Sequence, residues 1–240
     1  MDWDDNHVHH FIARWHEQDI YAAIEEMIAT ITPSSAGRLL NELAAHLQQE
    51  STDLNSMVIL VHAGIQFCLA NSIILKTEDP QTAAHLRQQA AELAGRLASA
   101  TWPGWNSPDL IIHDTHLLFG MEAARLYLRL SQENQQEPAL AARAQWLLAA
   151  HCMAHLQWQQ AHQHFQQAAT LAVTPQYVDF CNAYAAMCML LTDPYNSQYR
   201  LEWSTAHHTL MQHENGEEVL RQTITAYNVF LSLQAQQPTN

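Results

Sequence analysis

The chain has 240 residues, enough to bury a sizeable core in one extended domain or two smaller ones. It carries 10 lysines and arginines against 24 aspartates and glutamates, so its formal net charge is −14. This balance argues against a nucleic-acid partner and against docking on anionic lipid, because both need a cationic protein face.

The predicted elements are helices throughout. The sequence has only six glycines and shows no alternating run of β-branched residues. Apolar residues recur at helical spacing instead, as at Leu40, Leu43 and Leu47. We therefore expect an all-α fold of about ten or eleven helices. Their expected ranges are 5–17, 19–30, 34–49, 53–76, 80–99, 108–132, 138–156, 159–172, 175–191, 197–213 and 217–235.

Five of the eight prolines follow a serine, threonine or aspartate, whose short side chain can accept a hydrogen bond from the start of a helix. That order is typical of a helix start, where proline at the first position sacrifices no helical hydrogen bond. The five starts are expected at Thr32-Pro33, Asp79-Pro80, Ser107-Pro108, Thr174-Pro175 and Asp193-Pro194.

The range 57–75 is mostly apolar and about long enough to span a membrane. It also contains His62, Gln66 and Asn71, and neither flank has a basic cluster. We expect a helix buried among other helices, which is apolar all round for the same reason. A membrane span is the alternative.

The longest break between predicted helices is the loop at 101–107. It divides the single expected domain, 1–240, into possible halves at 1–100 and 108–240. Trp102 and Trp105 lie in it, beside Pro103 and Gly104. The two indoles either plug the helix ends or anchor a partner on the surface.

A helical hairpin is predicted at 142–172. Leu148 and Ala149 form a large-small pair on its first helix. Ala161, Phe165 and Ala168 form a small-large-small triplet on the second, at spacings of four and three. This pattern resembles the tetratricopeptide repeat, a family built from pairs of antiparallel helices. Only this hairpin matches well; the other helix pairs are expected to be degenerate.

The resemblance implies a TPR-like α-solenoid or helical bundle, with a surface that holds a partner segment. By position, that surface would include Arg143, Trp146, Ala150 and Met153. The family's clamp for a peptide carboxylate uses basic residues and asparagines, whereas Leu147 and Ala150 stand at such places. The resemblance therefore implies an apolar groove, unless Trp146 and Met153 belong to the core.

A leucine-rich stripe is predicted on the last helix, at Leu220, Ile224, Tyr227 and Leu231.

Four cysteines, at 68, 152, 181 and 188, have apolar neighbours and no metal-type CxxC spacing, and we expect them to be small core residues.

Histidine is abundant, with 16 residues. His7, His9 and His10 lie beside two aspartates, and the pairs His113/His116 and His151/His155 have helical spacing. Such groups can hold a metal ion, but no HExxH or di-iron ExxH motif occurs. We expect no metal or other cofactor; an all-α metal-dependent protein or enzyme is the alternative.

These observations favour a non-enzymatic protein-interaction module, such as an adaptor, chaperone or inhibitor. Its acidity favours a partner whose apolar or amphipathic segment lies in basic surroundings. A symmetric homodimer is also open. The acidic N-terminus does not resemble the basic start of a signal peptide, so we expect a cytoplasmic protein.

Overall fold

The computed structural model describes residues 11, 13, 15, 20–50, 53–134 and 137–236. Across these residues the backbone forms ten α-helices, one short 3-10 helix and no strand, which confirms the all-helical prediction. The elements are α2 (Ile20–Thr30), α3 (Pro33–Glu50), α4 (Leu54–Ile74), α5 (Pro80–Ala100), η1 (Pro103–Trp105), α6 (Asp114–Glu133), α7 (Pro138–Ala154), α8 (Trp158–Leu171), α9 (Pro175–Thr192), α10 (Ser197–Leu210) and α11 (Gly216–Ala235). The helix expected at 5–17 falls largely outside the described residues.

Three of the five predicted proline starts are confirmed. Pro33, Pro80 and Pro175 each open a helix. The oxygen of the preceding side chain accepts a backbone N–H bond, for example Thr82 N to Asp79 Oδ1 at 3.0 Å. These caps satisfy amide groups that a helix start leaves without partners.

The starts predicted at Ser107-Pro108 and Asp193-Pro194 are wrong. Pro108 lies in a turn in which Leu110 N donates to Ser107 O, and α6 begins only at Asp114. Asp193 follows the end of α9 and accepts from Tyr195 N at 3.1 Å, while Asn196 caps α10. An acceptor followed by proline suits a turn as well as a helix start, and sequence alone does not separate the two.

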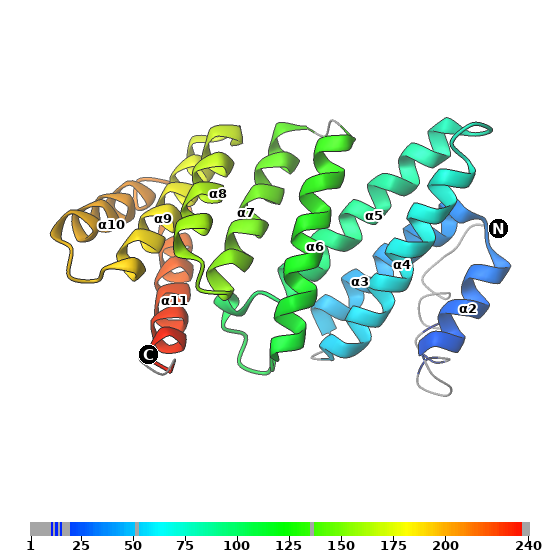
Figure 1. Ribbon diagram of the computed structural model, residues 1–240, viewed down its shortest axis with the longest axis horizontal. Coiled ribbons are helices and arrows are strands. Elements are labelled where there is room, and N and C mark those ends of the chain that lie inside the picture. The colour runs from blue at the N-terminus through cyan, green and yellow to red at the C-terminus, as the bar shows by residue number, and fades with distance from the viewer. Residues whose placement is uncertain are drawn as a thin grey trace. The chain divides into compact units, whose positions relative to one another are not determined.

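The chain forms two compact units, Met1–Ala100 and Thr101–Asn240. In the first unit, α3, α4 and α5 pack against one another, and α2 packs against α3 and α4 (Figure 1). Leucine and alanine dominate the core, with Leu40, Leu60, Leu86, Leu93 and Leu97 fully buried.

Helix α4 is long and apolar enough to cross a membrane by length and composition. Both α3 and α5 pack on it, and Leu60, Val61 and Cys68 are inaccessible. A helix with neighbours on more than one side needs apolar residues around most of its circumference. This packing accounts for the apolar residues of 57–75 that face α3 and α5, whereas Ile73 and Ile74 are 70% and 69% exposed.

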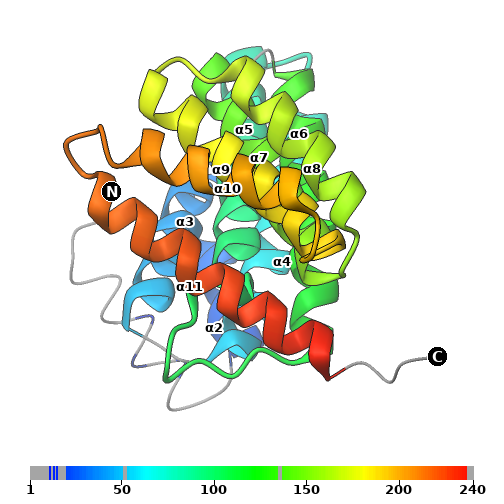
Figure 2. The ribbon, with the colours of Figure 1, turned by 90° about the vertical axis from the view of Figure 1, so that its left-hand side faces the viewer.

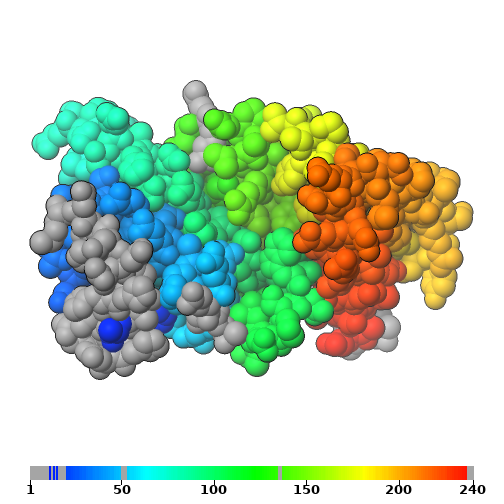
Figure 3. Space-filling model, turned by 180° about the vertical axis from the view of Figure 1, so that it is seen from behind, coloured from blue at the N-terminus to red at the C-terminus, as the bar shows by residue number. Residues whose placement is uncertain are grey.

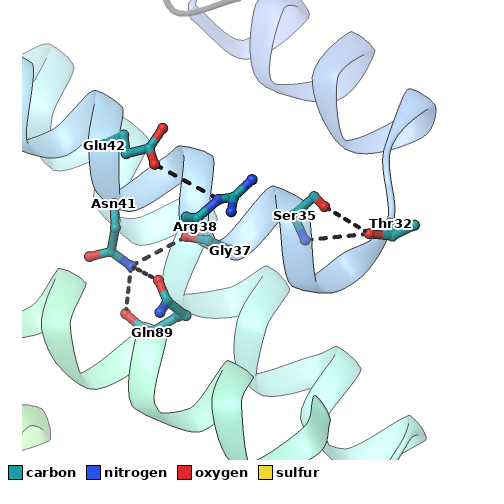
Figure 4. A network of polar contacts seen from close by, with 7 residues as sticks. All are labelled: Thr32, Ser35, Gly37, Arg38, Asn41, Glu42 and Gln89. Atoms are coloured by element: carbon teal, nitrogen blue, oxygen red, sulfur yellow. Dashed lines mark hydrogen bonds and ion pairs between the residues drawn. The ribbon is translucent and has the colours of Figure 1, made fainter. Parts of the chain in front are cut away.

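A buried amide pair joins α3 to α5 (Figure 4). Asn41 Nδ2 lies 2.7 Å from Gln89 Oε1 and 3.1 Å from Gln89 O. It also lies 3.3 Å from Gly37 O, one turn back on its own helix. Because both side chains are buried, the pair forms at only one axial offset of the two helices and specifies their register.

In the second unit, α6 to α10 each pack against the next helix in the chain, as Figure 1 shows. α11 packs against η1, α9 and α10 and lies in front in Figure 2. From behind, α11 and the adjoining part of α10 form the red and orange surface in Figure 3. Consecutive packing of this kind follows from short connections between antiparallel neighbours.

The hairpin predicted at 142–172 is present as α7 and α8. Ala149 and Ala161 are fully buried and let the two helices approach closely, and Phe165 is fully buried as well. At the turn, Leu156 is left-handed, with φ 58°. Gln157 N donates to Cys152 O at 2.8 Å, and Leu156 N donates to Met153 O at 2.8 Å. This is a Schellman cap in which leucine occupies the position that usually favours glycine.

Helix α11 buries a different stripe from the predicted one. Its buried residues include Thr223, Ala226 and Phe230, whereas Ile224 and Leu231 are 41% and 40% exposed. Phe230 reaches the ring of Trp102, with centroids 6.1 Å apart. Because the face of α11 that carries Phe230 is the buried one, the leucine-rich stripe lies at the edge of the contact between α11 and the rest of unit 2.

Candidate functional site

The groove lining predicted on α7 lies in the core. Trp146 is 4% exposed, and Ala150 and Met153 are inaccessible. Arg143 is exposed, but the other three side chains offer no surface that a partner can contact. The predicted apolar groove at these residues is therefore corrected to a packed interior, because α6 and α8 both pack on α7.

Trp102 plugs this interior. Its side chain is fully buried, and its indole Nε1 donates to Ala150 O at 3.0 Å. Its ring lies 4.7 Å from Trp105 and 5.1 Å from Trp146, in edge-to-face geometry at both contacts. Trp105 remains 38% exposed. The burial agrees with the plug alternative for Trp102, while Trp105 forms the outer rim of the cluster.

The second unit has an open groove elsewhere, between α8 and α10, with α9 as its floor. It encloses about 450 Å³. α8 contributes His162 and Gln166; α9 contributes Asp179, Asn182, Ala185 and Ala186; α10 contributes Gln198, Leu201, Glu202, Thr205, Ala206 and Thr209.

Local sequence explains why this space stays open. The alanines of α9 at the floor are too small to fill it, and α8 and α10 each pack on α9. α10 itself buries only Leu210 among its described residues. Leu201 lies at the groove with 61% of its surface exposed. A helix with so little buried surface leaves apolar side chains, here Leu201, accessible to another molecule.

Hydrogen-bond acceptors line the groove, together with the amides of Gln166, Asn182 and Gln198, which can donate as well. Thr205 Oγ1 donates to Leu201 O at 2.8 Å, and Thr209 Oγ1 donates to Thr205 O at 3.1 Å. His162 Nδ1 lies 3.0 Å from Ala185 O, so Nδ1 carries the proton and Nε2 of the neutral ring is an acceptor. Each hydroxyl donates its only proton to a carbonyl of its own helix, so its oxygen can only accept a hydrogen bond from a bound molecule.

Two carboxylates complete the lining. Asp179 Oδ2 lies 2.9 Å from His213 Nε2, and both side chains are about three-quarters buried. Glu202 Oε1 accepts from Gln198 Nε2 at 2.9 Å, on the exposed side of α10. The described lining includes no lysine or arginine. The groove is therefore anionic, with one partly shielded and one accessible carboxylate.

The cysteine thiols are unsuited to nucleophilic attack. All four are buried in the core, as predicted. Burial raises the pKa of Cys68 and Cys181 to about 12 and that of Cys152 to about 11. It also raises the pKa of Cys188 well above its ordinary value. The thiols are protonated near neutral pH, and the thiol form is a poor nucleophile and metal ligand.

The His113/His116 pair takes part in a helix cap. His116 Nδ1 accepts from His113 N at 3.2 Å at the start of α6. His151 is fully buried in α7. Within the described ranges, no group of three or more histidine, cysteine or acidic side chains is placed to hold a metal ion. His7, His9 and His10 lie outside those ranges.

Burial also lowers the pKa of two histidines on α8 and α10. His164 on α8 is affected, although a hydrogen bond with Gln167 opposes the change. His207 on α10 has its pKa lowered by burial, and its ring lies 3.8 Å from that of Trp203. At both residues the cause is desolvation, which disfavours the charged imidazolium.

Sequence reasoning missed the groove because its residues come from three helices. The available signals were the paired alanines at 185 and 186 and the sparse apolar pattern of α10. Neither signal predicts that α8 and α10 lie on either side of an open groove whose floor is α9. Comparisons with protein-family models, with curated proteins and with solved structures found no match.

Proposed function

We propose that the chain is a non-enzymatic protein-interaction module that binds a segment of a partner in the α8–α10 groove. The observation that carries this proposal is the open groove itself. It combines an alanine floor, an exposed leucine and a rim of side-chain atoms that can still accept hydrogen bonds. Stacked helices commonly bind peptides on such surfaces. The helix stack is proposed to be TPR-like, with α7 and α8 as its best-formed repeat.

An adaptor, chaperone or inhibitor acting in the cytoplasm fits this proposal. The binding surface moves from the predicted residues on α7 to the groove on α8, α9 and α10. Its acidic rim suits a partner with basic surroundings, and its alanines and Leu201 suit apolar side chains between the charges.

Site-specific photocrosslinking tests the location. A benzophenone amino acid is placed at Gln198 or Gln166 in the groove, and at the exposed Gln132 of α6 as a matched control. In cells that naturally express the protein, we expect discrete heterologous adducts from the two groove positions and none of the same mass from position 132. Identical adduct patterns from all three positions, or none from the groove, would contradict the proposal.

A further inference from the structure

We propose that the groove recognises an arginine side chain of the partner segment, whose apolar neighbours pack on the alanine floor and Leu201. This inference rests on the proposed function and specifies the chemistry of the occupant. It follows from the donors and acceptors that the lining has left unused.

The first argument is the hydrogen-bonding state of three lining side chains. The lining also holds the amides of Gln166, Asn182 and Gln198, which can both donate and accept and therefore favour neither kind of occupant. The hydroxyl protons of Thr205 and Thr209 are committed to backbone carbonyls of α10, and the Nδ1 proton of His162 is committed to Ala185 O. Their remaining oxygens and ring nitrogen only accept hydrogen bonds. An occupant rich in acceptors would leave them unpaired, whereas an occupant rich in donors would satisfy them.

The second argument is charge. Asp179 on α9 and Glu202 on α10 line the groove without a described lysine or arginine beside them. His213 supports one oxygen of Asp179, and Gln198 supports one oxygen of Glu202. Each carboxylate has a further oxygen able to accept. A cation in the groove gains charge-assisted hydrogen bonds from a carboxylate, and the chain's net charge of −14 favours its approach.

The third argument selects arginine over lysine. The acceptors are distributed over three helices: His162 on α8, Asp179 on α9, and Glu202 with the threonines on α10. A guanidinium carries five N–H donors in a planar fork, whereas an ammonium is a compact point charge with three. The guanidinium plane and the methylenes before it also suit contact with Ala185, Ala206 and Leu201.

A displayed library of random peptides tests the inference on the full chain. Binders are selected on the native protein and counter-selected on Ala186→Trp, whose indole fills the groove floor; circular dichroism verifies that this variant remains helical. We expect the peptides lost on Ala186→Trp to share one arginine flanked by apolar residues.

Fluorescence anisotropy of the best selected peptide then measures its affinity. Replacing the peptide arginine by glutamine is expected to weaken binding about tenfold or more. Glu202→Gln and Asp179→Asn in the protein are expected to weaken it about tenfold each. Glu218→Gln on α11 removes the same charge outside the groove and is expected to change the affinity less than about twofold.

The outcomes separate the two proposals. Groove-dependent peptides that lack a shared arginine, or that bind equally well with lysine in its place, overturn the arginine inference and leave the groove as a binding site. Equal losses from Glu202→Gln and Glu218→Gln also overturn it, because they indicate only a general charge effect. If every selected peptide binds Ala186→Trp as tightly as the native protein, both proposals fail.

Discussion

The cores of the two units are built from different side chains, although both consist of packed helices. Unit 1 buries leucines and alanines and fixes α3 against α5 with the Asn41–Gln89 amide pair. Unit 2 buries a cluster of large rings around Trp102, including Trp146, Tyr184 and Phe230.

The difference shows two ways of specifying helix packing. An aliphatic core is tolerant of small shifts, so a directional polar contact sets its register. An aromatic cluster sets its own geometry, because each ring fits only in a few edge or offset orientations. We therefore expect unit 2 to depend on single residues more strongly than unit 1.

The largest effect is expected from Trp102→Ala. It removes a fully buried indole and its hydrogen bond to Ala150 O, and should lower the free energy of unfolding by about 3–5 kcal/mol. Urea unfolding followed by circular dichroism and tryptophan fluorescence measures the change. Trp105→Ala is the matched control; because its side chain is 38% exposed, it should cost about half as much or less. Equal costs would show that Trp102 does not hold the cluster.

A smaller effect is expected from alanine at two mid-helix glycines. A Cβ at Gly120 in α6 would meet Thr101 Oγ1 and the His151 ring, both fully buried, and Gly120→Ala should destabilise unit 2 by about 1–3 kcal/mol. A Cβ at Gly64 in α4 would lie 2.8 Å from Leu93 Cδ1, the end of a flexible side chain.

Gly64→Ala is thus the counterpart in unit 1. Alanine improves helix propensity by about 1 kcal/mol, which offsets the shift of Leu93, so the net change should lie within about 1 kcal/mol of zero. Thermal unfolding of the two variants provides the comparison. A larger loss from Gly64→Ala than from Gly120→Ala would reverse the proposed contrast between the units.

Asn41→Ala in unit 1 is expected to have a smaller effect than Trp102→Ala or Gly120→Ala in unit 2. This change leaves Gln89 Oε1 buried without the 2.7 Å bond from Asn41, at a cost of about 1–2 kcal/mol. Asn71→Ala is matched to it, because the Asn71 amide donates to Phe67 O of its own helix α4, at 2.9 Å, and joins no second helix among the described residues. We expect that control to cost less than about 0.5 kcal/mol in urea unfolding. Similar costs at both positions would argue against the register role of the amide pair.

Much of the secondary structure could be read from the sequence. Helical periodicity, scarce glycine and capped prolines predicted an all-helical chain and most of its boundaries. The start of α6 was misplaced because a proline turn precedes it. The alanine and phenylalanine positions of α7 and α8 predicted their close hairpin, since small residues permit helices to approach and large ones fill the remaining space.

The site was less predictable. Trp146, Ala150 and Met153 were assigned by position to a groove, with the core as the alternative for Trp146 and Met153, and neighbouring helices cover all three. In α11, the leucine-rich stripe suggested the buried face, yet Phe230 took that place because it reaches the Trp102 cluster. A one-dimensional pattern shows which residues share a helix face, but it does not show how many neighbours cover that face.

The sequence by itself determined the helices and the hairpin at α7 and α8, because those depend on residues close together in the chain. Only the tertiary structure decided that this hairpin's tryptophan and methionine are core. It also decided that the open groove of unit 2 lies between α8 and α10. Folding brings these helices together over α9, and hydrogen-bond acceptors from all three helices line the groove. Burial and access depend on distant packing partners, and local periodicity carries no information about them.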